Sequence, residues 1–222
     1  MRTAQRSLSA LTWLMHTRTQ GFDLARHNVF FDDDYASEFD DVFVRRRLPR
    51  KGTVYVCAQD RSCRGEAPHG RERLLALVNA PALDDRCGPL DHAEVESCEQ
   101  RSRELLQSCG LHLSIEQPSQ QMLSRTPTDF ARLFPGSEGA LYGPAPHGWM
   151  ALFKRSGATT AVPGLFLAGG SVHPGPGVPM AAMSGQQAAA TLLAHLDSTS
   201  RSRLAPTSGG TSTPSATTAA TR

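Results

Sequence analysis

The 222-residue sequence lacks several patterns that would assign a function directly. Its five cysteines include no C-x-x-C pair, so neither a zinc site nor a disulfide framework is indicated, and free thiols in a reducing compartment are expected. No apolar run approaches the ~20 residues that cross a bilayer, which argues against a transmembrane helix but leaves surface attachment to a membrane open. The 23 Lys and Arg residues against 21 Asp and Glu give a net charge of +2, which provides no broad basic surface for nucleic acid.

Catalytic and metal-binding patterns are also scarce. No Ser/His/Asp triad or carboxylate pair can be assembled from the sequence, so we assign no general base. Acidic residues cluster between positions 32 and 41, but they lack the glycine and the ligand spacing of a calcium loop. We therefore predict no metal site and assign these acids to helix capping and a solvated face.

The sequence does contain a regular order of strands and helices, and its 39% hydrophobic content supports a real core. Runs of β-branched, aromatic and aliphatic residues predict strands at 27–31, 53–58 and 73–80, with a further strand after Gly110. Capping and charge signals predict helices at 32–47, 91–110 and 126–136. Residues 1–26 are expected to form an N-terminal helical segment, and the Ser/Thr-rich residues 197–222 a disordered tail.

One stretch, "GLFLAGGSVHPGPGVPMAAMSGQQAAA" at 164–190, is unusually rich in glycine and proline. Residues 165–168 predict a short buried strand, Gly169 and Gly170 a turn that allows close approach of a ligand, and 179–196 a helix. The stretch is neither a phosphate-binding P-loop nor a G-x-G-x-x-G motif, so its residues leave a structural turn and a cofactor turn both open. One helix face is small and apolar, which predicts tight packing against a sheet or a cofactor: Ala182, Gly185, Ala189, Leu192 and Leu196.

The segments "LAGGSVHPGPGVPMAAMSG" and "GALYGPAPHGWM" resemble the bacterial carotenoid desaturases of the phytoene-desaturase type, within the flavin-dependent amine-oxidase-like superfamily. Within that family the sequence is most similar to hydroxycarotenoid 3,4-desaturases, also called methoxyneurosporene dehydrogenases. The resemblance covers roughly residues 7–196. It implies an α/β fold, in which residues 27–160 form an α+β substrate-binding domain and 161–196 supply the last strand, turn and helix of a Rossmann-like FAD-binding domain.

The resemblance also implies a reaction and a set of site residues. Two hydrogens would leave adjacent carbons of an acyclic hydroxy- or methoxy-carotenoid, with FAD as the cofactor. The residues implied to touch FAD are Gly169, Gly170, Gly177, Val178, Pro179 and Met180, and those implied for the substrate are Tyr142, His147 and Trp149. If one side chain near the flavin takes part in the reaction, His147 and His173 are the candidates.

Two departures from the family pattern limit this interpretation. No strand-GxGxxG-helix precedes the matched region, so we expect a C-terminal portion whose partner is an N-terminal FAD-binding half. "FKRSG" at 153–157 stands where relatives often have Phe-Arg-Pro, which leaves the roles of Lys154 and Arg155 open. Two alternatives remain: a non-catalytic remnant or interaction module of the same fold, and a flavin oxidoreductase acting on an amine or porphyrinogen. The expected location is the bacterial cytoplasm, with contact at the inner membrane left open.

Overall fold

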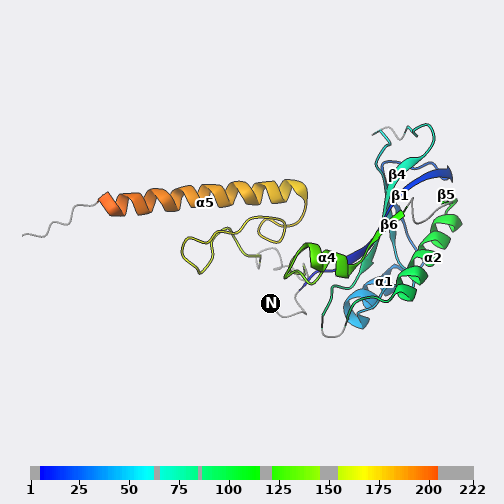
Figure 1. Ribbon diagram of the computed structural model, residues 1–222, viewed down its shortest axis with the longest axis horizontal. Coiled ribbons are helices and arrows are strands. Elements are labelled where there is room, and N and C mark those ends of the chain that lie inside the picture. The colour runs from blue at the N-terminus through cyan, green and yellow to red at the C-terminus, as the bar shows by residue number, and fades with distance from the viewer. Residues whose placement is uncertain (1–5, 63–65, 85–86, 116–121, 146–154, 205–222) are drawn as a thin grey trace, which may run out of the picture.

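The computed structural model describes residues 6–62, 66–84, 87–115, 122–145 and 155–204. Its centre is a six-stranded sheet in the order β2-β3-β4-β1-β5, with β6 also paired to β1 (Figure 1). All of the pairs are antiparallel. The strands are β1 (Ser9–Gly21), β2 (His27–Phe30), β3 (Val54–Ala58), β4 (Glu72–Ala80), β5 (Leu111–Ser114) and β6 (Met122–Arg125). The strands predicted at 27–31, 53–58 and 73–80 and after Gly110 are therefore confirmed.

The longest strand, β1, occupies the segment predicted to be helical, and that prediction is wrong. Residues Ser9–Trp13 are all buried, so the start of the strand shows no alternation of buried and exposed positions. The alternation begins only at Leu14, which is 40% exposed, beside the buried Met15. A strand that is covered on both faces resembles a helix in sequence, because both are then continuous apolar runs.

The predicted helix at 32–47 is divided in two. Asp34 caps α1 (Tyr35–Phe39), a π-helix η2 (Asp40–Arg45) follows, and Arg46 ends it in the left-handed region at φ +57°. Asp34 confirms the predicted capping role, but Asp41 is buried rather than on a solvated face. Its carboxylate accepts hydrogen bonds from the side chains of Arg45 and Arg47 and from the backbone of Arg50, which provide the partners that a buried charge requires.

One face of the sheet is covered by α2 (His92–Ser108), which lies along the strands (Figure 1). Asp91 caps this helix as predicted, and it shares a reciprocal capping box with Glu94. The buried core between α2 and the sheet includes Leu11, Trp13, Val56, Leu74, Ala76, Cys98 and Leu106. A shorter helix, α4 (Pro127–Leu133), begins with a second capping box between Thr126 and Asp129, also as predicted.

The segment from 155 to 204 differs from its predicted structure at two places. Residues 165–168 form no strand but a single bridge between Thr159 and Phe166, because no neighbouring strand among the described residues pairs with them. The helix α5 (Val178–Leu204) continues eight residues beyond its predicted end, into the predicted tail. Within this extension the Ser198 and Thr199 hydroxyls donate to the carbonyl of His195, one turn earlier in the helix. Residues 205–222 lie outside the described part.

The predicted packing face of α5 is mostly exposed, and a neighbouring face contacts the chain instead. Ser184 is 1% exposed, and the ring of His195 meets the ring of Phe166 at a centroid distance of 5.7 Å. The helix therefore contacts the rest of the chain through the face that holds Ser184 and His195. The predicted face is turned to solvent, and its residues Leu192 and Leu196 are 41% and 52% exposed. None of the helices in the described ranges is long and apolar enough to cross a membrane.

Candidate functional site

The face of the sheet opposite α2 carries two rows of side chains that run across five strands. Strand register places directly paired residues on the same face, so each row can be followed from β2 to β6. One row is His27, Cys57, Leu75, Leu14 and Leu123, and the other is Val29, Tyr55, Leu77, Thr12 and Arg125. We call these two rows the apolar strip. Four strand spacings make it about 19 Å long, and the rows lie about 7 Å apart.

The apolar strip is exposed at Leu14 and at both ends, whereas Thr12, beside Leu14, is buried. Leu14, Val29 and Leu123 are 40%, 48% and 48% exposed. Monomeric proteins rarely expose a continuous row of large apolar side chains, and such rows often mark a binding surface. An elongated surface of leucine side chains suits a long apolar ligand better than a compact polar one.

Polar contacts mark both sides of the apolar strip. On one side Arg73 lies opposite His16, and its Nε donates to Asp60 at 2.9 Å. On the other side the buried carboxylate of Glu38 accepts a hydrogen bond from Asn79 Nδ2 at 2.7 Å. The strip therefore has polar limits along both edges, which confines an apolar ligand to the direction across the strands.

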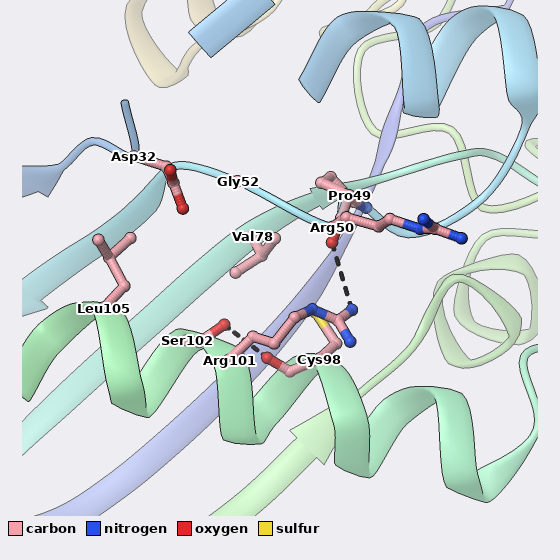
Figure 2. Close-up of a pocket in the computed structure, with 9 residues that line it drawn as sticks. All are labelled: Asp32, Pro49, Arg50, Gly52, Val78, Cys98, Arg101, Ser102 and Leu105. Carbon is pink, nitrogen blue, oxygen red and sulfur yellow. Dashed lines mark hydrogen bonds between the residues drawn. The ribbon is translucent and has the colours of Figure 1, made fainter. Parts of the chain in front are cut away.

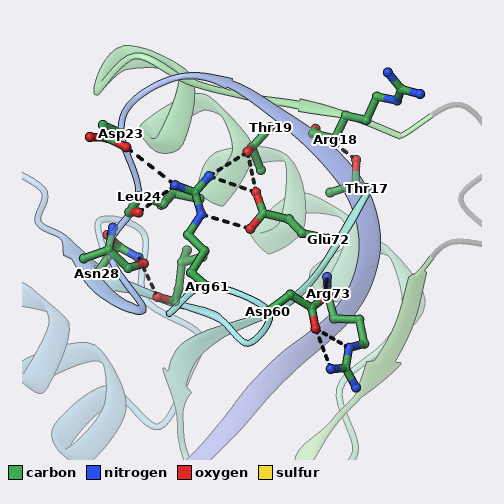
Figure 3. A network of polar contacts seen from close by, with 12 residues as sticks. Thr17, Arg18, Thr19, Asp23, Leu24, Asn28, Asp60, Arg61, Glu72 and Arg73 are labelled. Carbon is green, nitrogen blue, oxygen red and sulfur yellow. Dashed lines mark hydrogen bonds and ion pairs between the residues drawn. The ribbon is translucent and has the colours of Figure 1, made fainter. Parts of the chain in front are cut away.

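A buried network fixes the sheet beside the strip (Figure 3). The guanidinium of Arg61 forms two hydrogen bonds to the carboxylate of Glu72, both at 3.0 Å, and donates to the carbonyl of Leu24 at 2.7 Å. Thr19 donates to the same carboxylate at 2.6 Å. Burial alone raises the pKa of Glu72, but the hydrogen bonds from Arg61 and Thr19 outweigh it and hold the pKa below its usual range. This network joins β1, β4 and the turn after β3.

A smaller hollow on the α2 side does not suit a long ligand (Figure 2). Its volume is about 30 Å³, enough for one or two water molecules. Arg101 crosses it and donates to the carbonyl of Pro49 at 3.2 Å, and Ser102 donates to the carbonyl of Cys98 at 2.8 Å. This hollow is a structural contact between α2 and the loop before β3.

The glycine-rich turn forms a second candidate surface. Gly169 and Gly177 adopt φ +120° and +110°, a region that side chains disfavour, and a Cβ on either would meet no atom within 4 Å. Backbone is therefore presented to open space at both positions. The N–H of Gly169 donates to the buried Ser184 hydroxyl at 3.2 Å, which anchors the turn to α5.

Arg155 joins this turn to the segment that holds Tyr142. The side chain is only 7% exposed. It donates to the carbonyls of Tyr142 at 3.0 Å, Pro144 at 3.4 Å and Gly170 at 3.4 Å. The two segments also touch directly, because a Cβ on Gly143 would lie 2.8 Å from the Cβ of Ser171. Sequence reasoning left Arg155 without a role, and the structure makes it the link between the predicted substrate and cofactor segments.

The structure brings most of the predicted cofactor residues together. Val178, Pro179 and Met180 form the first turn of α5, directly after Gly177, and the Val178 side chain is 85% exposed. That turn contains no acidic residue, and the first N–H groups of a helix lack intrahelical partners, so it favours an electron-rich group.

The predicted substrate and catalytic residues are placed only in part. Tyr142 is 40% exposed and lies beside the turn through Arg155. His173 lies within the turn with an exposed side chain, and its N–H donates to the carbonyl of Ser156 at 2.9 Å. His147 and Trp149 fall outside the described residues. Within the described ranges, no group of three or more His, Cys, Asp or Glu side chains is arranged to hold a metal.

Comparisons with known proteins identify the family to which the chain is similar. The family model for flavin containing amine oxidoreductases matches residues 15–193, a range that includes the glycine-rich turn and most of the apolar strip. Hydroxyneurosporene desaturases from Rubrivivax gelatinosus, Cereibacter sphaeroides and Rhodobacter capsulatus are 64%, 45% and 43% identical over 97%, 88% and 85% of this chain. The chain spans 40%, 38% and 36% of the length of these relatives. These matches confirm the resemblance drawn from the sequence.

Proposed function

The chain belongs to the flavin containing amine oxidoreductase family, and from that membership we propose that it serves in an FAD-dependent carotenoid desaturase. The observation that carries this proposal is the 64% identity to the hydroxyneurosporene desaturase of Rubrivivax gelatinosus. The proposed reaction removes two hydrogens from adjacent carbons of an acyclic hydroxy- or methoxy-carotenoid and converts the single bond between them into a double bond.

The apolar strip supports a polyene as the substrate. The side chains of Leu14, Leu75 and Leu77 cover its centre, and an extended hydrocarbon lying on them would remove apolar surface from water on both sides. Neither row of the strip contains a carboxylate that could pair with an ammonium group. Tyr55 and His27 are the only side chains of the two rows that carry an aromatic ring. These features favour a polyene over the amine considered as an alternative.

The glycine-rich turn fits an edge of FAD. A side chain at Gly169 or Gly177 would fill the open space that their backbone faces, and the first turn of α5, which follows Gly177 directly, has N–H groups without intrahelical partners. Bound FAD would supply the two-electron acceptor for the hydrogens that leave the substrate. The residues of this chain would bind the ring edge and hold the turn in place through Arg155 and Ser184.

The proposed assembly includes an N-terminal FAD-binding half and contact with a membrane. Support for the first comes from the exposed apolar side chains of α5, among them Leu193 at 62%. Support for membrane contact comes from the aromatic residues Phe31 and Tyr35, which are 58% and 52% exposed. Their rings meet edge to face, with centroids 5.6 Å apart. Exposed aromatic rings favour the membrane–water interface, where an apolar polyene would be dissolved. The proposed location is the bacterial cytoplasm at the inner membrane.

A chimera tests the proposed function. This chain replaces the matched segment of the Rubrivivax gelatinosus relative, and the purified protein is assayed for FAD absorbance and for a red-shifted carotenoid product. We expect a yellow, active protein. A colourless and inactive chimera, beside an active intact relative, would favour the non-catalytic interaction module instead.

A further inference from the structure

At the β2 end of the apolar strip, beside the apolar Val29, two polar side chains are paired with each other. His27 on β2 and Tyr55 on β3 project from the same face of the sheet, and their rings are stacked with centroids 6.2 Å apart. The Tyr55 hydroxyl lies 2.8 Å from Nδ1 of His27, within hydrogen-bond distance. Tyr55 is directly opposite Leu77, so the pair continues the leucine surface without a gap.

The pair retains unused hydrogen-bonding capacity in either tautomer. If the phenol donates to Nδ1, then Nε2–H of His27 remains a donor and the phenol oxygen remains an acceptor. If Nδ1–H donates to the phenol oxygen, the phenol O–H remains a donor and Nε2 an acceptor. Burial raises the pKa of Tyr55, so the phenol keeps its proton at neutral pH. One donor and one acceptor are the complement of an alcohol group.

The opposite end of the strip has a different chemistry. Arg125 lies in the same row as Tyr55, on the far strand, and a guanidinium has donors but no acceptor. An alcohol bound there could not donate its own proton to the arginine. Of the two ends, only that of His27 and Tyr55 matches both functions of a hydroxyl group.

We propose that His27 and Tyr55 bind the terminal hydroxyl group of an acyclic polyene whose hydrocarbon chain lies on the apolar strip. This inference rests on the proposed function and adds the residues that select a hydroxylated substrate over an unhydroxylated one. The hydrocarbon supplies most of the affinity, and the pair sets the register of the chain along the strip. Because His27 is exposed, we expect moderate selection, about tenfold, rather than the far larger factors of fully buried polar sites.

The test compares two polyenes that differ only in the terminal hydroxyl, using the chimera with the Rubrivivax gelatinosus relative. The wild-type chimera and the Tyr55→Phe and His27→Leu variants are assayed for kcat/KM by product absorbance. Tyr55→Phe removes one oxygen and keeps the ring packed. We expect Tyr55→Phe to lower the ratio of kcat/KM for the hydroxylated polyene to kcat/KM for the unhydroxylated one about tenfold. The change should come from a higher KM for the hydroxylated polyene alone. His92→Leu, on α2 and away from the strip, with its side chain 89% exposed, serves as the matched control for His27→Leu and should leave the ratio unchanged.

The outcomes separate the two proposals. Equal losses on both substrates, or an unchanged ratio in Tyr55→Phe and His27→Leu, would overturn the role of the pair and leave the desaturase function intact. If the wild-type chimera converts neither polyene while the intact relative converts both, the desaturase function fails, and the role of the pair fails with it. Far-UV circular dichroism on each variant identifies any that do not fold.

Discussion

Replacing Glu72 with glutamine should destabilise the chain by about 3–5 kcal/mol, because it removes the buried carboxylate that pairs with Arg61. Asp23 also lies 3.6 Å from Arg61, but its side chain is fully exposed and would compensate little. The side chains of Glu72 and Arg61 are 3% and 5% exposed and are joined by two hydrogen bonds of 3.0 Å. Replacing Arg61 with methionine should cost a similar amount, since the carboxylate would then be unpaired. The double variant Arg61→Met/Glu72→Leu should cost much less than the sum of the single losses.

A neighbouring ion pair provides the control. Arg73, next to Glu72 on β4, bonds Asp60 in the turn after β3, but its side chain is 67% exposed, so Arg73→Met should cost only about 0–1 kcal/mol. The measurement is urea unfolding of the full chain followed by far-UV circular dichroism, with the midpoint and slope compared between variants. If Glu72→Gln costs no more than Arg73→Met, the assignment of the buried pair as a major stabilising contact is incorrect.

The carboxyl group of Glu72 also makes the stability of the folded chain depend on pH. Its pKa is lowered in the folded chain from an ordinary value of 4.5, so its contribution to stability is complete above pH 4.5. As the pH falls through the lower folded-state value, the folded chain takes up a proton there and the contribution is lost. Glu72→Gln should therefore show a smaller loss of stability between pH 5 and pH 3 than the wild-type chain. Parallel curves would contradict this.

Three further predictions concern the turn and the core. Gly143→Ala should cost about 1–3 kcal/mol by urea midpoint, because φ is +68° and the new Cβ would lie 2.8 Å from Ser171; an unchanged midpoint would argue against the contact. Arg155→Lys should weaken FAD binding by the chimera about tenfold in an absorbance titration, since lysine does not span three carbonyls; equal affinity would remove the linking role. Burial raises the pKa of Cys98 to about 11, so iodoacetamide at pH 8 should modify the exposed Cys109 first. Equal labelling of Cys98 and Cys109 in peptide maps would contradict the burial of Cys98.

Local signals in the sequence predicted local structure well. Asp91 and Thr126 begin α2 and α4 as expected, because a capping box is formed by residues three positions apart and needs no distant partner. The same reasoning failed at residues 9–21. Whether that segment is a strand depends on pairing with β4 and β6, which lie more than fifty residues away in the chain.

The candidate site was only half visible in the sequence for the same reason. Gly169 and Gly177 stand in one continuous segment, so their turn could be proposed directly. The apolar strip joins residues from five strands, and Leu14 and Leu75 become neighbours only through strand register. Arg155 was also missed, because its three carbonyl partners carry no side-chain signature. Alternating leucines in the predicted strand at 73–80 were the one local signal of the strip.

The register of β3 also limits how the length of this chain can vary. Tyr55 and Cys57 face the strip, while Val54 and Val56 face the core, because successive residues of a strand point to opposite faces. Deleting one residue inside β3 would exchange the two sets and place a phenol in the core. Exchanges among leucine, isoleucine and methionine on the strip should be tolerated, whereas insertions and deletions must be absorbed in the connections between strands. Homologous chains should therefore vary in loop length while the five strands of the strip keep the same length and phase.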